Sequence, residues 1–173
     1  MVKFVPYDEK THRAQFFDLN VEFLTWYSDK MLERSNINAE AMIGQSIREY
    51  VKSFLDDFVK IRPPEGIIYV LEARGRVVGM GALKKLETEV GEIKRMYIRP
   101  EFRGKGFGKE LLKRLIEKSK EFGYSTLRLE SAKFMPAAHH VYRSAGFKER
   151  GKYSGGETPE WALPHCIFME KKL

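Results

Sequence analysis

The sequence predicts an α/β or α+β protein in which two N-terminal helices precede the main part of a sheet. Three observations support this fold class. Apolar residues recur at helical spacing before residue 66, the spacing changes to that of strands at Ile67, and strands then alternate with helices. The 173 residues contain no internal repeat, low-complexity tract or long linker. We therefore expect one domain, with residues 1–66 on the N-terminal side and 67–173 as its core.

The N-terminal half is expected to begin with a short strand at Val2 to Val5 and to continue with two amphipathic helices. The second of these helices follows Asn38, which is a typical N-cap residue. The apolar stripes are Phe16, Leu19, Phe23 and Trp26 in the first helix, and Ile43, Ile47, Tyr50, Phe54, Phe58 and Ile61 in the second. Pro63 to Gly66 then interrupts the helical pattern.

The C-terminal half is expected to open with a hairpin. Ile67 to Leu71 is typical of a buried strand, Arg74-Gly75 of a turn, and Val77 to Leu83 of the partner strand. A third strand follows from Val90 to Ile98.

Beyond this strand, a helix is predicted by the inward stripe of Leu111, Leu112, Leu115, Ile116, Ser119 and Phe122. Gly123 ends it, and Thr126 to Glu130 forms the next strand. Pro136 begins a short helix that Gly146 ends. The last two predicted strands are Phe147 to Tyr153 and Cys166 to Lys171.

The composition is typical of a soluble globular protein, with 43% hydrophobic and 32% charged residues. The single cysteine, Cys166, permits no intramolecular disulfide, and neither it nor the four histidines have paired metal-ligand spacing, so no metal is expected. The N-terminus lacks the apolar core of a signal peptide, and no apolar run approaches the roughly 20 residues of a membrane span. A cytoplasmic location is therefore expected, without membrane contact.

The net charge of +7 is unevenly distributed. Residues 1–66 contain nine Lys and Arg against eleven Asp and Glu, a net charge of −2, whereas residues 67–173 carry +9. A cationic half can attract a polyanionic cofactor or nucleic acid, so the sign does not choose between them. No recognisable DNA-reading helix or RNA-binding motif is present, and no nucleic-acid partner is expected.

An anion site is predicted where the third strand meets the following helix, at residues 103–108. The three glycines of this segment allow positive φ and let backbone N–H groups approach a ligand. These groups precede a helix, whose positive dipole end favours a phosphate. Arg103 and Lys105 add mobile positive charge. The local chemistry therefore predicts a pyrophosphate site.

Two familiar nucleotide loops do not fit this segment. A Walker loop ends in Gly-Lys-Ser/Thr, whereas Gly108-Lys109 is followed by Glu110. A dinucleotide fingerprint has the pattern Gly-x-Gly-x-x-Gly, and the glycines at 104, 106 and 108 have the wrong phase.

The segment instead resembles motif A of the GNAT family of N-acetyltransferases, through Ile98, Arg103, Gly106 and Gly108. The resemblance covers roughly residues 67–173. It implies a mixed, mostly antiparallel central sheet of about six or seven strands flanked by about four helices. It also implies that the loop holds the pyrophosphate of acetyl-CoA through Arg103, Gly104, Lys105, Gly106, Phe107 and Gly108.

The strand before the loop breaks its alternation, because its apolar positions move from odd at Ile93 to even at Met96 and Ile98. A one-residue slip of this kind suits a β-bulge. In the GNAT family, such a bulge frees an amide that polarises the thioester carbonyl, and the pantetheine pairs like an added strand. The resemblance implies that Met96, Tyr97 and Ile98 supply these backbone contacts.

Acyl transfer to an amine needs a proton acceptor, because an alkyl ammonium has a pKa of about 10. A carboxylate can accept that proton directly or through water. Glu92 is the candidate, since it lies on the strand that should pass the thioester. A solvent-facing glutamate without a catalytic role is the alternative, and a water chain as the base remains open.

Residues 138–147 resemble motif B of the same family, and Tyr142 falls on the tyrosine that protonates the coenzyme A thiolate in many members. A phenol of pKa about 10 keeps its proton at neutral pH and can donate to sulfur. The alternative is a tyrosine that only packs its helix onto the sheet. Met135 stands where the family often has an asparagine that contacts the cofactor arm, so the resemblance does not imply a side-chain contact there, and backbone contacts from Lys133 to Met135 stay open.

Four further features have less specific interpretations. His139 and His140 face different directions on a helix and are expected to be surface or partly packed. Trp26 and Tyr27 could line an acceptor pocket, although aromatic residues on such a helix are more often core. Cys166 is expected to be a small buried side chain. The loop 155–161 is expected to border the acceptor pocket or a partner in a homodimer.

The sequence thus predicts an acetyl-CoA-dependent N-acetyltransferase acting on a primary amine of a small molecule or peptide. The net charge of −2 in residues 1–66 mildly favours a cationic acceptor such as a polyamine or a lysine-like amine. The alternative is a non-catalytic module that binds or senses acyl-CoA.

Overall fold

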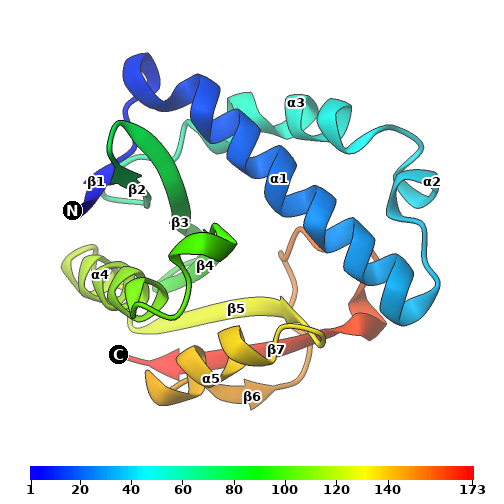
Figure 1. Cartoon of the computed structure of the whole chain (residues 1–173). Helices are drawn as coiled ribbons and strands as arrows, with labels where there is room; N and C mark the ends of the chain where they lie inside the picture. The colour runs from blue at the N-terminus through cyan, green and yellow to red at the C-terminus, as the bar shows by residue number, and fades with distance from the viewer.

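A seven-stranded sheet in the order β1-β2-β3-β4-β5-β7-β6 forms the centre of the protein in the computed structural model, which describes residues 1–173 (Figure 1). The strands are β1 (Val2–Pro6), β2 (Ile67–Ala73), β3 (Arg76–Glu87), β4 (Val90–Ile98), β5 (Thr126–Ala132), β6 (Lys148–Arg150) and β7 (Cys166–Lys172). Every neighbouring pair is antiparallel except β4 and β5, which are parallel. The predicted mixed, mostly antiparallel sheet is confirmed.

Five α-helices surround this sheet: α1 (Glu9–Ser35), α2 (Ala39–Ile43), α3 (Ile47–Phe58), α4 (Phe107–Glu121) and α5 (Pro136–Ser144). Two 3₁₀ turns, η1 (Pro100–Phe102) and η2 (Leu163–His165), complete the secondary structure. No helix combines the length and the apolar character that a membrane span would require.

The second predicted helix is in fact two helices, α2 and α3, so this prediction was wrong. Gly44 ends α2 with φ of 73°. Ser46 then begins α3 with a capping box, in which its hydroxyl accepts from the Glu49 amide and the Glu49 carboxylate accepts from the Ser46 amide. The apolar spacing continues across this break, which is why periodicity alone predicts one helix. Ile61 lies beyond the end of α3.

The two faces of the sheet carry separate cores. On one face, α4 and α5 pack over residues that include Ile93, Leu129 and Tyr142. On the other face, α1 and α3 contribute Phe16, Leu19, Phe23, Leu55 and Phe58 to a second core. Figure 1 shows α1 crossing the molecule on one side of the central strands, with α4 and α5 on the other side. The sheet is therefore buried on both faces near its centre.

The parallel strands β4 and β5 pair over only part of their length. Their register extends from Val90 opposite Thr126 to Ile93 opposite Leu129. Beyond that point β5 continues to pair with β7, and β4 continues to pair with β3. The sheet consequently opens between the two strands, and the β5-facing edge of β4 is unpaired from Lys94 onward. Figure 1 shows β4 and β5 diverging at this place.

The predicted strand bounds differ from the structure most at β3 and β6. Instead of Val77 to Leu83, β3 spans Arg76–Glu87. Instead of Phe147 to Tyr153, β6 spans only Lys148–Arg150, because Phe147 packs into the core beside Tyr142 and Tyr153 packs against Phe168. The strand β4 has the predicted bounds.

Candidate active site

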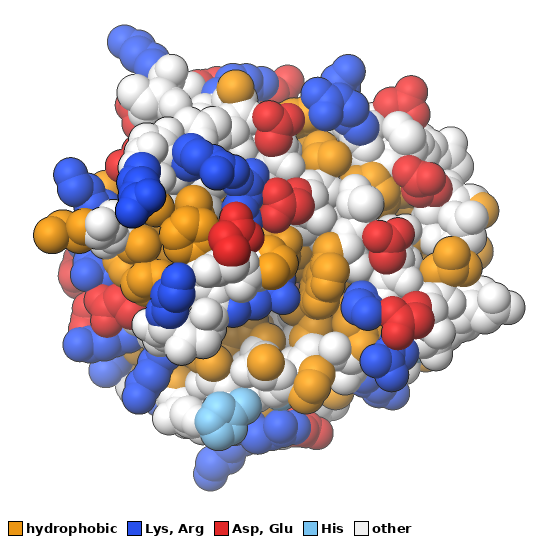
Figure 2. Space-filling model, in the orientation of Figure 1, with side chains coloured by type: hydrophobic (Ala, Val, Ile, Leu, Met, Phe, Trp, Pro, Cys, Tyr) orange, Lys and Arg blue, Asp and Glu red, His pale blue; other side chains and the backbone are white.

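A cleft of about 440 Å³ lies where the sheet opens, between β4, the loop that precedes α4, and the start of α5. Figure 2 shows the apolar side chains that gather around this hollow in the middle of the view. The predicted cofactor-binding residues that line it are Met96, Tyr97, Ile98, Arg103, Gly104, Gly106, Phe107 and Gly108. Lys105 is not part of the lining, because its ammonium lies 5.4 Å from the Phe102 ring and donates to the Glu101 carbonyl at 3.2 Å.

The loop before α4 exposes a run of backbone N–H donors. Gly104 and Gly106 have φ of 74° and 81°, a conformation that glycine adopts without the strain of a Cβ. The Arg103 amide donates to the Pro100 carbonyl, and the Glu110 amide donates to the Gly106 carbonyl. Between them, the amides of residues 104–109 have no backbone acceptor in the chain. Six consecutive donors at the N-terminus of a fifteen-residue helix form a cradle suited to a pyrophosphate.

The Arg103 side chain is not the mobile charge that the sequence suggests. Its Nε donates to the Ile98 carbonyl at 2.8 Å. Its guanidinium lies 5.5 Å from the Trp26 ring and 5.3 Å from the Tyr97 ring, distances typical of cation–π contacts. Arg103 therefore ties the loop to the end of β4 and fixes a positive charge at the mouth of the cleft.

The predicted β-bulge in β4 is present at Arg95. Tyr97 pairs with Met80 and Lys94 pairs with Ala82, so Gly81 alone faces two residues of β4. Arg95 has φ of 55°, which is unusual for a residue with a side chain. The extra residue lets Ile93, Met96 and Ile98 pack on the same core despite their odd and even numbers.

A second pocket, of about 180 Å³, is lined by the preceding residues of β4. Its β4 residues are 92–95, whereas those of the cleft are 96–98. Its other walls come from α1, α2, α3, β5 and the loop before β7, with the residues Phe23, Leu24, Tyr27, Ala39, Ile43, Ile47, Tyr50, Glu130, Glu157, Thr158, Pro159, Trp161 and Ala162. The loop 155–161 thus borders this pocket. The sequence predicts that the loop borders either an acceptor pocket or a partner in a homodimer.

Glu92 lies in the wall of the second pocket and is only 2% exposed, so the alternative of a solvent-facing glutamate is wrong. Its carboxylate accepts a hydrogen bond from the Tyr153 hydroxyl at 2.9 Å and one from the Lys94 ammonium at 3.3 Å. Burial raises the pKa of Glu92 above its usual range, although Lys94 and Tyr153 act in the opposite direction. A carboxylate with a raised pKa is a better proton acceptor than an ordinary glutamate.

Tyr142 lies on α5 and lines the cleft at its other side. It is 6% exposed, and its ring packs edge-on against Phe147 with the centroids 6.1 Å apart. Burial raises the pKa of Tyr142 to about 12. The tyrosine therefore does pack its helix onto the sheet, and it also presents a protonated phenol to the cleft.

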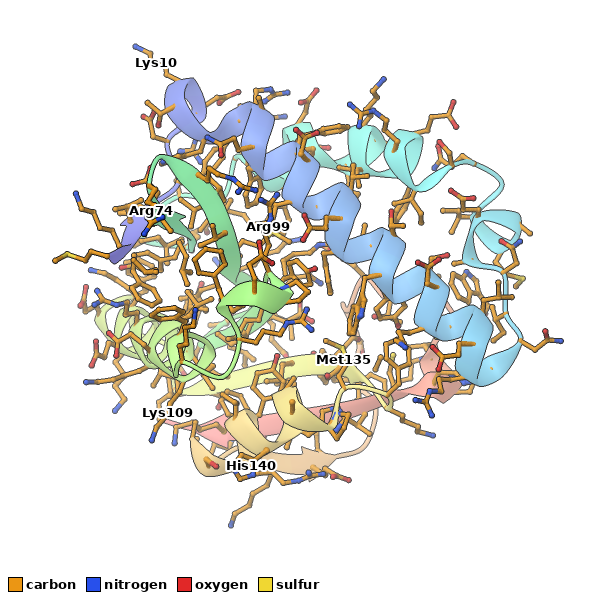
Figure 3. The ribbon with its side chains drawn as sticks, in the orientation of Figure 1. Lys10, Arg74, Arg99, Lys109, Met135 and His140 are labelled. Carbon is orange, nitrogen blue, oxygen red and sulfur yellow. The ribbon has the colours of Figure 1, made fainter.

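The region around α5 contains three further residues singled out in the sequence. Met135 is the residue that caps α5 and it lines the cleft, at the end of β5 between α1 and α5 (Figure 3). Its amide donates to the Ala132 carbonyl, so that amide is already used within the chain. His139 is buried rather than superficial, with its Nε2 3.1 Å from the Ser131 hydroxyl, whereas His140 is exposed on the outer side of α5 (Figure 3).

Sequence reasoning missed three residues of the second pocket and its surroundings: Arg95, Glu130 and Tyr153. Only Arg95 had a local signal, since it sits where the alternation of β4 breaks. Trp26 and Tyr27, for which core packing is the more common role, line the cleft and the second pocket respectively. Cys166 is buried at the start of β7 with its sulfur 3.9 Å from the Tyr27 hydroxyl, as predicted for a small buried side chain.

The fold and the cleft are those of a known class of protein. The model of the acetyltransferase (GNAT) family matches residues 22–147. The chain is 35% identical over 119 residues to the IAA acetyltransferase of Azospirillum brasilense, with 68% of this chain and 74% of that protein covered. It is 31% identical over 156 residues to the uncharacterized N-acetyltransferase YsnE of Bacillus subtilis, with 80% and 99% covered.

The same fold occurs in the PaiA N-acetyltransferase of Thermoplasma acidophilum, which was crystallised in complex with coenzyme A. The two chains superpose with a TM-score of 0.70 at 17% identity, and 100% and 99% of their lengths are covered. The chain belongs to the GNAT family of acetyltransferases. It is therefore an acyltransferase, and its donor is an acyl-coenzyme A.

Proposed function

We propose that the protein transfers the acetyl group of acetyl-CoA to the primary amine of a small molecule or peptide. The observation that carries this proposal is that consecutive residues of β4 line two neighbouring pockets. The cleft ends at Met96, and the second pocket begins at Arg95. A donor in the cleft and an acceptor in the second pocket would bring their reacting atoms together beside the bulge.

The cofactor would follow the groups that the cleft presents. Its pyrophosphate would bind the amides of residues 104–109, and its pantetheine would pair with the free edge of β4 at Met96 to Ile98. The Arg103 guanidinium would lie beside the phosphates. The acetyl group would then reach the bulge, where a backbone amide can donate to the thioester carbonyl and stabilise the oxyanion.

The chemical roles divide between the two sides of this opening. As the amine nitrogen bonds to the acetyl carbon, its proton passes to Glu92, directly or through water. The C–S bond then breaks, and Tyr142 donates a hydrogen bond to the departing sulfur. An ordinary thiol has a pKa of about 8.5, well below that of Tyr142, so we expect a hydrogen bond to the developing thiolate rather than complete proton transfer.

Incubation of the purified protein with acetyl-CoA and a panel of primary amines tests the proposal. We expect an acetylated amine by mass spectrometry and an equal amount of free coenzyme A thiol. A protein that binds acetyl-CoA and acetylates no amine in the panel would instead be an acyl-CoA-binding or sensing module, and the proposal would be wrong.

A Gly108→Ala substitution tests the pyrophosphate cradle. Gly108 does not have positive φ, and a Cβ there would meet no atom of the chain within 4 Å. Alanine is also favoured over glycine inside a helix by up to about 1 kcal/mol, so the variant should be at least as stable as the wild type. Its methyl group would nevertheless intrude on the phosphates, and we expect coenzyme A affinity to fall by about tenfold or more, or at least about 1.4 kcal/mol.

Calorimetric titration with coenzyme A, together with thermal unfolding, measures both effects. Gly151→Ala is the matched control, because Gly151 also lacks positive φ, has open space around it and lies outside the cleft. Equal coenzyme A affinity in the two variants would show that Gly108 does not face the cofactor.

A further inference from the structure

The second pocket contains an unusual set of charges. Five charged side chains line it: Glu92, Lys94, Arg95, Glu130 and Glu157. Lys94 forms ion pairs with Glu92 at 3.3 Å and with Glu157 at 3.2 Å, and Lys84 also binds Glu157. These two lysines lower the pKa of Glu157 to about 2, although its burial acts in the opposite direction. Three of the five charges are thus already neutralised within the chain.

Glu130 and Arg95 are the two charges that remain. The Glu130 carboxylate accepts a hydrogen bond from the Thr158 hydroxyl but has no cation at ion-pair distance. Arg95 has no carboxylate at ion-pair distance, and its Nε is buried without a hydrogen-bond partner. The pocket therefore presents one uncompensated anion and one uncompensated cation to whatever enters it.

The guanidinium of Arg95 packs against aromatic rings and forms no ion pair with a carboxylate. Its guanidinium lies 4.4 Å from the centroid of the Phe54 ring and 5.8 Å from that of Phe58, both on α3. Burial lowers the pKa of Arg95, with Tyr50 and Glu157 acting in the opposite direction. Stacking on aromatic rings contributes less than the desolvation of an unpaired guanidinium costs. A ligand carboxylate placed against the open side of the Arg95 guanidinium would accept the hydrogen bonds that its N–H groups do not make within the protein.

The bulge explains how this charge enters the acceptor pocket. In a regular strand, Lys94 and Arg95 would point to opposite faces of the sheet. Because Arg95 is the extra residue of the bulge, both side chains line the same pocket as Glu92. Glu92 and Arg95 are three residues apart on β4, a span of about 10 Å or less, which a molecule of amino-acid size can bridge between two long side chains.

We propose that the acceptor carries a carboxylate as well as its amine, as a free amino acid does, and that Arg95 binds this carboxylate. The inference rests on the proposed function, since it names the acceptor class of the same site. The amine then lies toward Glu92 and the unpaired Glu130, and the carboxylate lies toward α3. This acceptor differs from a polyamine, which the charge of residues 1–66 alone would favour.

Matched pairs of acceptors test the inference on the wild-type protein. Each amino acid in the panel is compared with its amide, which keeps the amine and loses the carboxylate charge. We expect kcat/KM for the amino acid to exceed that for the amide by at least about 30-fold, the factor that corresponds to losing one partner of a buried charge pair. Equal acetylation of amides, or a preference for polyamines, would overturn the inference and leave the proposed function intact.

Two variants then assign the preference to Arg95. Arg95→Met keeps a long apolar side chain against Phe54, and we expect kcat/KM to fall further for each amino acid than for its amide, so that the preference for amino acids is lost. Arg95→Lys keeps the positive charge but lacks the paired N–H donors of the guanidinium, and it should keep part of the preference for amino acids over amides. An equal loss on both members of each pair would contradict the role of Arg95.

Coenzyme A affinity and thermal unfolding serve as controls for the folding of both variants. If Arg95→Met does not fold, the lysine variant and the wild-type pairs decide the question. If no amine is acetylated, the proposed function and this inference are both wrong. If amines are acetylated without regard to the carboxylate, only this inference is wrong.

Discussion

Replacing Tyr142 with phenylalanine should lower kcat by about 10²- to 10³-fold, the usual contribution of one hydrogen-bond donor to a developing anion, and leave acetyl-CoA affinity nearly unchanged. The phenylalanine ring keeps the packing of Tyr142 against Phe147 and loses only the hydroxyl. The leaving thiolate then departs without a hydrogen-bond donor. Steady-state kinetics and calorimetric titration with a non-reacting acyl-CoA analogue measure the two effects separately.

The pH dependence of the wild-type enzyme should also reflect this residue. Because burial raises the pKa of Tyr142 to about 12, the phenol holds its proton over the whole range in which the protein is normally assayed. No loss of kcat from ionisation of Tyr142 is therefore expected between neutral pH and about pH 10. A fall in kcat in this range that vanished in the Tyr142→Phe variant would contradict this assignment.

Tyr69→Phe is the matched control for Tyr142→Phe. Tyr69 is 7% exposed, belongs to the same core as Tyr142 and lies on β2, outside the lining of the cleft. This variant should turn over at the wild-type rate, since it loses a hydroxyl that has no part in the reaction. If Tyr142→Phe were equally active, the thiolate would leave without help from Tyr142, and the residue would be only a packing tyrosine.

The cofactor side of the site could be predicted from the sequence because its determinants are local. Gly104 and Gly106 adopt positive φ, and together with Gly108 they leave an open run of backbone amides within a few residues. The shift of apolar positions between Ile93 and Met96 likewise records the bulge within one strand. Each feature depends on the residues of one short segment, so it can be predicted from the local sequence.

The acceptor side could not be predicted in the same way, since it is assembled from distant segments. Glu92 meets Tyr153, which is 61 residues away in the chain. Lys94 meets Glu157 from a loop that has no regular structure of its own. Neither the burial of Glu92 nor the isolation of Arg95 follows from periodicity, because both depend on which loops and helices close over β4.

The break between α2 and α3 is indicated by cap residues in the sequence, although the apolar periodicity continues across it. The apolar stripe continues through Ile43 and Ile47 at a spacing of four, which is typical of one helix. Gly44 and Ser46, with Glu49 three residues later, carry the pattern of a C-cap followed by a capping box. The break shapes the second pocket, since Ala39, Ile43 and Ile47 line that pocket at this bend.

Replacing Glu92 with glutamine is the second substitution for which we expect a large effect, a fall in kcat/KM of about 10²- to 10⁴-fold. Glutamine has the same shape and can still accept from Tyr153, but it cannot take the proton of the amine. In the wild type, kcat/KM should rise as the pH passes the raised pKa of Glu92, because only the ionised carboxylate accepts a proton. The glutamine variant should lack this acidic limb, and a variant that kept it would show that another group is the base.

A Tyr153→Phe variant separates catalysis by Glu92 from a merely structural role. The hydrogen bond from Tyr153 stabilises the ionised carboxylate and so lowers the pKa of Glu92, and its removal should raise that pKa further. The acidic limb of kcat/KM should then move to higher pH, while the rate on the high-pH plateau stays close to that of the wild type. The phenylalanine ring keeps its edge-on contact with Phe168, so folding should be preserved. A uniform loss of rate at every pH would mean that Tyr153 and Glu92 only hold the pocket together. Loss of a purely structural contact would not shift the pH at which the acidic limb of kcat/KM lies.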